Sequence, residues 1–527
     1  MYYLREDVYF EPLFNQWYAW PYLIAPVQGA RHTVNTHQRI MKSFVNNYQL
    51  HIMACKEPGM AGGEFLDCTE EQVEDINSLI SFIDHECKDL VELSSAVKEL
   101  DEMLRLHTSG ESIEGLYEHI PEPLKGYVEL FFDMEHNPSY RLLESLLYKS
   151  KYFKPELQSI SFGILSEVGE RPFVLSTPRL PDEKHIHLNL TYDSPVLDRI
   201  LKSREIPLSK EEMDSIFASL ECKGGLHYEK LFTSTPSSYS HKPVEKGLRL
   251  QYTGHAGFLV ETPGVAVLID PVIASRGEQY ADEVLSFNEL PPKIDFICIT
   301  HSHQDHANIE TLLQLRYKTD RILVPKNNGG SLADPSLKLL FQNIGFKVIE
   351  VEDLDEFILG DSRIQAIPFL GEHGDLNIRT KSAWLFAHEG KKVFFGADSS
   401  NLDINMYSHL QKIVGNVDLI AIGMECVGAP YTWLYGALHT KRVGKNIKNS
   451  RRLNGSDSVQ ALEISKIFGA KEVYIYALGL EPWYKYFMGV DYDDESTQIV
   501  ESNKMIEECM KIGIPCQSMF GRHTKEF

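Results

Sequence analysis

The sequence lacks any apolar run of about 18 residues, the length that a membrane-spanning helix needs. Its N-terminus has Arg5, Glu6 and Asp7 where a secretory signal peptide would have an apolar core. Basic residues are few, with 52 Lys and Arg against 75 Asp and Glu and a formal charge of -23. Because recognition of nucleic-acid phosphates needs a basic face, this balance argues against a nucleic-acid partner. We therefore expect a cytoplasmic protein that binds neither membranes nor nucleic acids.

Cysteine is scarce too, with eight residues in 527 and no C-x-x-C pair. Cysteines so few and so widely spaced are typical of reduced, buried thiols rather than of a disulfide framework. Hydrophobic residues make up 43% of the chain, which is enough for sizeable cores and argues against wholesale disorder. The length predicts two or three domains.

Residues 1–235 differ in pattern from the rest and are expected to form a mixed α/β N-terminal domain. A capping box at Thr69 and Gln72 precedes apolar residues at spacings of three and four from Val73 to Leu104. Ser94 is the one weak point in this long helical stripe. We expect the stripe to pack inside its own domain, with a dimer interface as the alternative.

Residues 236–246 belong to a stretch rich in Ser, Pro and Lys, which indicates a linker. From 247 to 527 predicted strands alternate with predicted helices. Segments 258–262 and 265–269 flank a Pro-Gly turn as a hairpin, and 294–300 is continuously apolar, as a buried central strand should be. The alternation predicts an α/β domain in which helices cover the sheets.

Six residues directly after that apolar strand carry the clearest chemical signal: His301, Ser302, His303, Gln304, Asp305 and His306. A buried core would have to find a partner for each of these polar side chains. A turned segment can instead aim His301 and His303 at one metal ion, and Asp305 and His306 at a second. The H-x-H-x-D-H pattern therefore predicts a dinuclear metal site.

A two-metal site needs further ligands, including a bridge, and they are expected where later strands end. Three acidic positions follow apolar stretches in this way: Glu372, Asp398 and Glu425. Taken singly, a carboxylate at a strand end is more often a turn former. Three in order after the hexad indicate ligands, and Asp398 is well placed as the bridge.

Two histidines remain open alternatives as ligands. His373 is the neighbour of Glu372, and spacing alone does not decide which of the two reaches the metal. His439 could supply a late histidine, but no strand delivers it, and a surface loop is the other interpretation.

This arrangement resembles the metallo-β-lactamase superfamily, whose αββα sandwich holds two metals at the edges of its facing sheets. Hydrolases of that superfamily usually have histidine where this chain has Glu372 and Glu425. Carboxylates in place of imidazoles favour iron or manganese over zinc, whereas zinc sites that generate hydroxide prefer histidine. The ligand set therefore indicates oxygen chemistry rather than hydrolysis.

A closer resemblance is to the diiron β-hydroxylases of nonribosomal peptide pathways, such as chloramphenicol biosynthesis. It runs nearly end to end through the segments REDVYFEP (5–12), WYAWPYL (17–23), HSHQDH (301–306), LVPK (323–326), PFLGEHGDL (368–376), IGMEC (422–426), SRRLNGSD (450–457) and LGLEPW (478–483). The resemblance implies a catalytic domain at 247–527 with two irons, in which Glu372 rather than His373 is the ligand. Glu372 and Asp398 are the residues expected to act in catalysis.

The same resemblance implies the reaction and the partners. An amino acid held as a thioester on a carrier protein would be hydroxylated at its β-carbon, with O2 as cosubstrate and two electrons from an external donor. The N-terminal domain would take part in dimerisation and in docking the carrier, so we expect a homodimer.

Residues 441–452 hold six basic side chains in twelve, which is unusual in a chain this acidic. They are Lys441, Arg442, Lys445, Lys448, Arg451 and Arg452. The cluster could receive the phosphate of a pantetheine arm or an acidic helix of a carrier. A solvated basic loop is the other interpretation.

Three other functions compete with the oxygenase. A zinc or manganese hydrolase of the metallo-β-lactamase superfamily is disfavoured by Glu372 and Glu425. A noncatalytic carrier-docking protein is disfavoured by the complete ligand set. A flavodiiron reductase would share carboxylate ligands, but no flavin-binding module is apparent after the metal domain.

Overall fold

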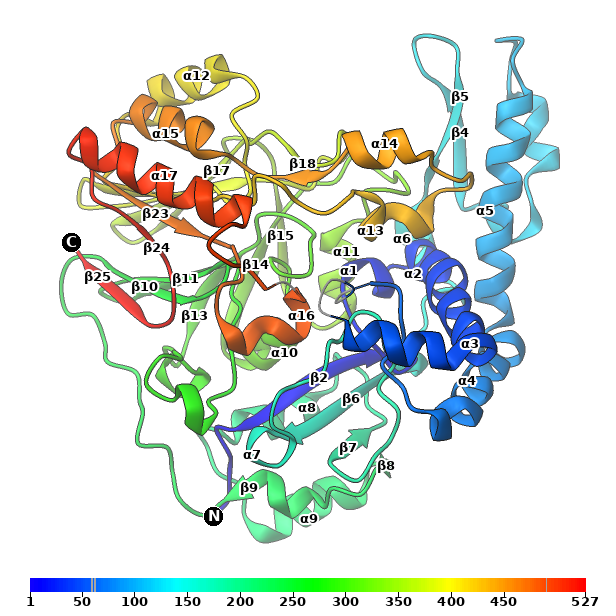
Figure 1. Cartoon of the computed structure of the whole chain (residues 1–527), viewed down its shortest axis with the longest axis horizontal. Helices are drawn as coiled ribbons and strands as arrows, with labels where there is room; N and C mark the ends of the chain where they lie inside the picture. The colour runs from blue at the N-terminus through cyan, green and yellow to red at the C-terminus, as the bar shows by residue number, and fades with distance from the viewer. Residues whose placement is uncertain (58–59, 61–62, 490) are drawn as a thin grey trace.

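The computed structural model describes residues 1–57, 60, 63–489 and 491–527. Figure 1 shows the N-terminal part (blue to cyan) lying against the C-terminal part (green to red). None of the described helices is long and apolar enough to cross a membrane.

Two seven-stranded sheets form the centre of the C-terminal part. The first has the order β15 (Val348–Val351), β14 (Thr319–Pro325), β13 (Ile294–Cys298), β12 (Val265–Ile269), β11 (Gly257–Thr262), β10 (Arg249–Gly254) and β25 (His523–Glu526). The second has the order β16 (Glu356–Leu359), β17 (Ser362–Ile367), β19 (Ala383–His388), β20 (Lys391–Phe395), β21 (Leu419–Gly423), β23 (Glu472–Tyr476) and β24 (Cys516–Ser518).

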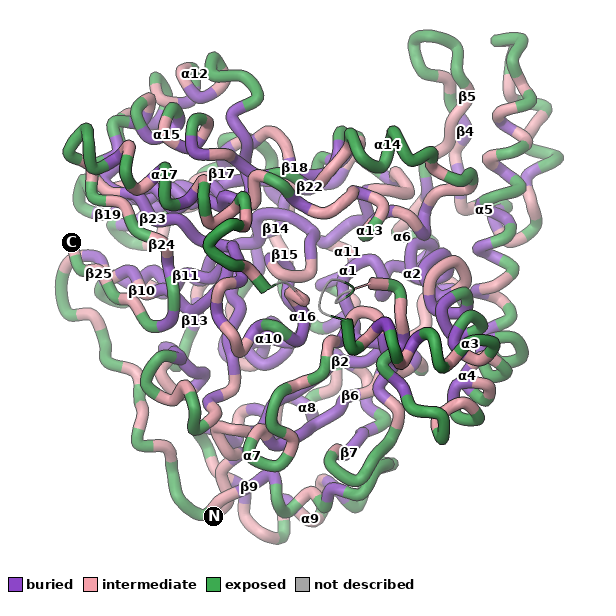
Figure 2. Tube along the Cα trace, viewed as in Figure 1, coloured by how far each residue is buried: buried purple, intermediate pink, exposed green. Residues whose placement is uncertain are grey.

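The two sheets pack face to face through apolar side chains, and helices cover their outer faces. Phe258 of the first sheet and Phe395 of the second lie with ring centroids 5.4 Å apart inside this core. The outer face of the second sheet packs against α12 (Ile404–Val414), α15 (Ser458–Ile467) and α17 (Thr497–Lys511). The first sheet packs against α10 (Ile309–Leu315) and α11 (Leu337–Asn343). The expected αββα sandwich is confirmed, and Figure 2 shows its central strands as buried.

The strand patterns in the sequence match the sheets closely. The predicted hairpin is the antiparallel pair β11 and β12. The continuously apolar segment contains β13, which pairs in parallel with β12 and β14 and is therefore central to its sheet. The hexad begins shortly after this strand ends. The candidate site therefore lies at the carboxyl edge of the first sheet.

The N-terminal part is mixed α/β, as expected. An antiparallel sheet has the order β3 (Trp17–Tyr18), β2 (Val8–Phe14), β6 (Gln158–Ile164), β7 (His185–Leu188) and β8 (Cys222–Lys223). Beside it lie the helices α2 (Pro26–His32), α3 (Arg39–Lys56), α4 (Val73–Glu86) and α5 (Lys88–Leu106), and the hairpin of β4 (Val128–Phe132) and β5 (Pro138–Leu142). The domain boundaries at 235 and 247 remain a prediction; between β9 (Phe232–Thr233) and β10 the chain has no regular element.

The long helical stripe is interrupted at a position that its apolar spacing does not reveal. Thr69 and Gln72 do form the predicted capping box, but the backbone leaves the helical region at Cys87 and divides the stripe into α4 and α5. Ser94 is buried and not a defect, because its carbonyl and hydroxyl accept hydrogen bonds from Arg31 of α2 at 2.9 and 3.3 Å. The stripe packs within the N-terminal core, as expected.

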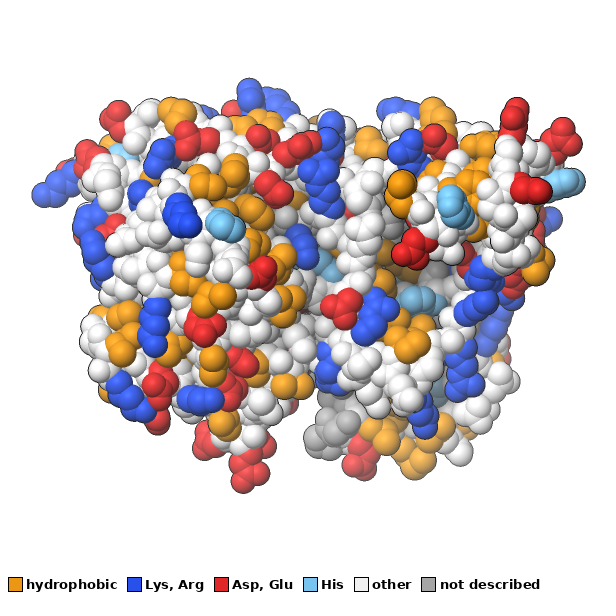
Figure 3. Space-filling view, turned by 90° about the horizontal axis from the view of Figure 1, so that it is seen from above, with side chains coloured by type: hydrophobic (Ala, Val, Ile, Leu, Met, Phe, Trp, Pro, Cys, Tyr) orange, Lys and Arg blue, Asp and Glu red, His pale blue; other side chains and the backbone are white. Residues whose placement is uncertain are grey.

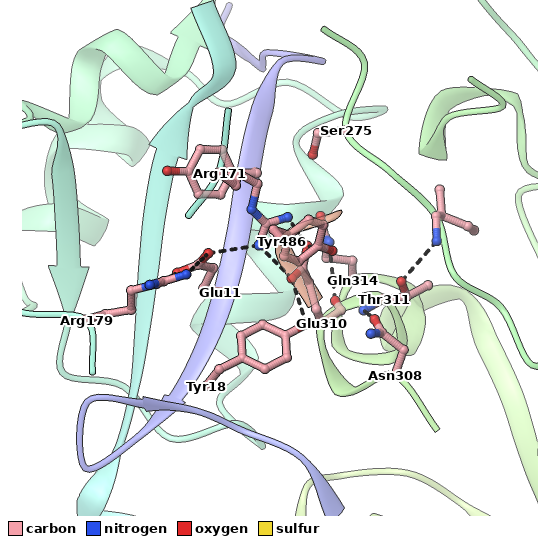
Figure 4. Close-up of polar contacts among 12 residues, drawn as sticks. Glu11, Tyr18, Arg171, Arg179, Ser275, Asn308, Glu310, Thr311, Gln314 and Tyr486 are labelled. Atoms are coloured by element: carbon pink, nitrogen blue, oxygen red, sulfur yellow. Dashed lines mark hydrogen bonds and ion pairs between the residues drawn. The ribbon is translucent and has the colours of Figure 1, made fainter. Parts of the chain in front are cut away.

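A buried cluster of charges joins the two parts of the chain (Figure 4). Glu310 of α10 accepts two hydrogen bonds of 2.9 Å from Arg171, which also donates to Glu11 of β2 at 3.0 Å. The hydroxyls of Tyr18 and Tyr486 donate to Glu310 at 2.8 and 3.2 Å. Since both carboxylates are 5% exposed or less, they depend on these partners.

Candidate metal centre

The hexad after β13 folds back so that its ligand atoms converge. His301 and His306 are fully buried, and the Nε2 atom of each has no hydrogen-bond partner among the described residues. The Nδ1 atom of His306 is held by Asp270 at 2.8 Å, and that of His301 lies 3.0 Å from the Thr300 hydroxyl. The rings are therefore fixed with one nitrogen free, the usual posture of metal-ligating histidines.

The first group of convergent atoms comes from His301, His303 and Glu372, whose donor atoms lie within 4.8 Å of one another. The Nδ1 atom of His303 is 3.0 Å from Oε1 of Glu372. Glu372 lies in β18 (Glu372–His373), which pairs with β22 (Leu453–Asn454) in the RRLNGSD segment. That motif thus supports the strand that presents the carboxylate.

The second group is formed by His301, His306 and Asp398. The Oδ2 atom of Asp398 lies 3.1 Å from Nε2 of His306 and 3.6 Å from Nε2 of His301, while its Oδ1 atom has no partner. This position between the two histidines suits a bridging carboxylate. Asp305 extends the group, with Oδ2 3.7 Å from Nε2 of His306.

Glu425 stands two residues after β21, and its carboxylate belongs to none of these groups in the described part of the chain. Burial raises its pKa well above the usual range, and the nearby carboxylates of Glu372, Asp398 and Asp305 raise it further. The Glu425 side chain therefore lies close enough to the cluster to interact electrostatically with the three other acidic ligand candidates.

The electrostatics of the cluster fit a cation. Burial lowers the pKa of His301 well below the usual range, so its free nitrogen is a lone-pair donor. Burial would also lower the pKa of His306, but Asp398, Asp305 and Asp270 raise it well above. Burial alone would raise the pKa of Asp305, yet His306 and a hydrogen bond from His255 lower it. Crowded carboxylates beside unpartnered imidazole nitrogens are what a bound metal cation would satisfy.

The two alternative histidines differ in position. His373 is buried, and its Nδ1 atom lies 3.2 Å from Nε2 of His303 and 2.8 Å from the hydroxyl of Tyr435, with Nε2 unpartnered. His439 lies at the wall of a cavity, with its ring 5.5 Å from that of Tyr431. Neither joins a convergent group with the carboxylates among the described residues.

Three residues beside the cluster were not singled out from the sequence. His255 lies in the turn after β10, and its Nε2 atom is 3.0 Å from Oδ2 of Asp305. Asp270 directly follows β12 and orients His306. Tyr435 places its hydroxyl 2.8 Å from both His303 and His373. Asp270 follows an apolar strand, as the predicted carboxylate ligands do, so the sequence pattern could have identified it. No sequence pattern points to Tyr435.

A cavity of about 630 Å³ leads toward the cluster from the boundary between the two parts of the chain. Tyr435 lines it together with residues of α5, the β4–β5 hairpin and the segments 328–333, 376–377 and 438–440. This volume lies in the range of small-molecule sites, and Tyr435 brings its wall into contact with His303. The cavity is thus the candidate path for a substrate.

Comparison with known proteins places these features in a family. The model of the diiron non-heme β-hydroxylase N-terminal domain matches residues 3–236, and that of the β-lactamase superfamily domain matches 266–440. The chain is 35% identical over 532 residues to the 4-amino-L-phenylalanyl-[CmlP-peptidyl-carrier-protein] 3-hydroxylase of Streptomyces venezuelae, covering 99% of each. The crystal structure of CmlA, a diiron β-hydroxylase from Streptomyces venezuelae, matches with a TM-score of 0.92 over 100% of this chain and 99% of that one, at 35% identity.

Similarity to hydrolases is narrower. The N-acyl-phosphatidylethanolamine-hydrolyzing phospholipase D 1 of Caenorhabditis elegans is 26% identical over 200 residues, which is 34% of this chain and 54% of the phospholipase. The similarity to the hydroxylase runs through both parts of the chain, whereas that to the phospholipase is confined to about a third of it.

Proposed function

The chain belongs to the diiron non-heme β-hydroxylase family, and from that premise we propose that it hydroxylates the β-carbon of an amino acid held as a thioester on a carrier protein. The reaction consumes O2, two electrons from an external donor and two protons; one oxygen atom enters the C–H bond and the other leaves as water. Similarity over the whole length to a hydroxylase of carrier-bound 4-amino-L-phenylalanine supports this substrate class.

The proposed ligand set has seven side chains. In this proposal His301, His303 and Glu372 would hold one iron, Asp305, His306 and Glu425 would hold the other, and Asp398 would serve both. The convergence of the first three, and of His306 with Asp398, supports this assignment. A carboxylate-rich set suits iron that changes oxidation state.

A bound diiron centre supplies the O2 activation that hydroxylation of a C–H bond requires. The protein supplies position and shielding around it. Asp270 keeps the proton on Nδ1 of His306, so that Nε2 is free to bind. Tyr435 separates the cavity from His303 and His373, and its hydroxyl fixes the orientation of both rings. Burial of these groups excludes water from the reacting centre.

We further propose that the protein works with an electron donor and as a homodimer; both rest on the family resemblance. The cytoplasmic location expected from the sequence stays a prediction.

The function is tested by supplying the reduced enzyme with O2 and a panel of carrier domains, each loaded with a different amino acid. Mass spectrometry of the released amino acid should show one added oxygen, derived from 18O2 and not from labelled water, for at least one arylalanine carrier. Hydrolysis of the thioester without oxygen incorporation would favour a hydrolase of the lactamase superfamily instead.

A further inference from the structure

Four cations that follow Thr440 in the chain have no ion-pair partner in the described part of the structure. Lys441, Arg442, Lys445 and Lys448 are exposed, and none forms an ion pair within the residues that the structure describes. Three of the four precede or begin α14 (Lys445–Ser450), and Lys448 lies on it. In a protein with a formal charge of -23, such an unneutralised group is a local reversal of sign.

The other two members of the basic cluster have structural roles. Nε of Arg451 donates to the carbonyl of Gly374 at 2.6 Å, and its guanidinium lies over the ring of Tyr431, 4.4 Å from the centroid. Nε of Arg452 donates to the carbonyl of Gly428 at 2.7 Å. These contacts hold the end of the segment against the chain near the metal site, and leave 441–448 as the part free to meet a partner.

The segment that carries the free cations begins at the open end of the cavity. Thr440, the residue before Lys441, lines the cavity, as do Phe131 and Arg141, whose exposure places this end at the surface. The inner end is the wall at Tyr435. In Figure 1 the segment before α14 reaches toward α5 and the β4–β5 hairpin. Figure 3 looks down on this face and shows a hollow between the two halves of the molecule, with Lys, Arg and acidic side chains around it.

Opposing charges near the segment are already engaged. Asp101 lines the cavity, but its carboxylate pairs with Arg105 and accepts from the hydroxyl of Thr440. Glu129 on the hairpin pairs with Arg141. The four cations are therefore not neutralised by the walls around them.

We propose that residues 441–448 are the docking surface for the acidic face of the carrier protein, positioned so that the carrier's arm enters the cavity toward Tyr435. This rests on the proposed function and names the surface that its partner uses. Charges at the rim of an interface mainly raise the association rate and fix the orientation of the partner, which is what delivery of a tethered substrate requires. The attraction should weaken as salt screens it.

The test compares two variants of the full-length iron-loaded enzyme. K441E/R442E/K445E/K448E reverses the docking surface. K184E/K246E/K412E/K466E reverses four other exposed cations that also lack ion pairs in the described chain and lie away from the cavity. The probe is the aminoacyl carrier domain that gives turnover in the panel above, labelled for fluorescence anisotropy. The first variant should bind it at least about tenfold more weakly at low salt, with a flatter salt dependence, while the second binds as the wild type does.

The same aminoacyl group on free pantetheine serves as the second measurement. Both variants should turn it over at the wild-type rate, because the cavity and the metal centre are untouched. If the first variant bound the carrier with an affinity within about twofold of the second variant's, the docking proposal would be overturned. An equal loss of turnover with the free pantetheine substrate would also overturn it. If no loaded carrier is hydroxylated by the wild type, the proposed function itself fails and takes the docking proposal with it.

Discussion

Replacement of Asp270 by Asn should weaken the binding of one iron without removing any proposed ligand. The Asp270 carboxylate lies 2.8 Å from Nδ1 of His306 and accepts a 2.7 Å hydrogen bond from the backbone N–H of Thr300. It therefore keeps the proton on Nδ1. An Asn amide in this fully buried position has only one acceptor oxygen, so its NH2 group must face either His306 or the N–H of Thr300.

If the NH2 group faces His306, two N–H groups oppose each other unless the ring carries its proton on Nε2 instead of Nδ1. Nε2 is the nitrogen that we assign to the metal. Loss of such an orienting carboxylate typically costs a factor of about 10–100 in metal affinity, or about 1.4–2.7 kcal/mol. Anaerobic Fe(II) titration against a competing chelator would resolve the two binding steps. We expect Asp270→Asn to weaken one step by that factor and leave the other nearly unchanged.

Asp418→Asn is the matched control. Asp418 is also shielded and accepts hydrogen bonds, from the backbone N–H of Lys392 at 2.9 Å and from Lys471 at 2.8 Å, but it lies outside the metal centre. It should change stability and not iron affinity. Wild-type affinity for both irons in Asp270→Asn would refute the role given to Asp270, and through it the assignment of His306.

Two further predictions concern the junction of the two parts of the chain. Arg171→Met leaves Glu310 buried without a cation, so the free energy of unfolding from denaturant titration should fall by about 3–5 kcal/mol. Arg363→Met removes a cation from an exposed pair and should cost less than about 1 kcal/mol. Equal losses of stability in the two variants would contradict the buried network. Burial raises the pKa of Glu144 to about 7 from its ordinary 4.5. Because the native state favours the protonated form, the wild type should lose stability relative to Glu144→Gln as the pH rises from about 5 to 7.5, and a pH-independent difference would refute this.

The sequence predicted that the candidate ligands follow buried strands, and they do. The hexad begins shortly after the end of β13, and Asp398 and Glu425 lie shortly after the ends of β20 and β21. Continuous apolar runs mark buried strands, so the sequence shows where these strands end. Parallel strands end at the same edge of a sheet, so residues that follow them come together. The fold class was predictable for the same reason and was sharpened by the family resemblance.

Contacts between distant segments were not predictable from pattern. The hydroxyl of Tyr435 reaches His303 across 132 residues, and Tyr22 of the N-terminal part packs its ring 5.7 Å from that of Tyr435. Local spacing carries no information on such pairs, since they depend on how the two parts dock. The break at Cys87 was hidden for a related reason: an apolar stripe continues across a kink when both helices bury the same face.

The central claim is that this chain holds two irons through the cluster around His301 and Asp398. The direct measurement is elemental analysis of the purified protein, with an optical spectrum before and after reduction, for the wild type and for Asp398→Ala. The account predicts about two irons per chain and a charge-transfer band that bleaches on reduction in the wild type, and a deficit of iron in the variant. Two zinc ions per chain after expression with ample iron, and no change on reduction, would contradict it.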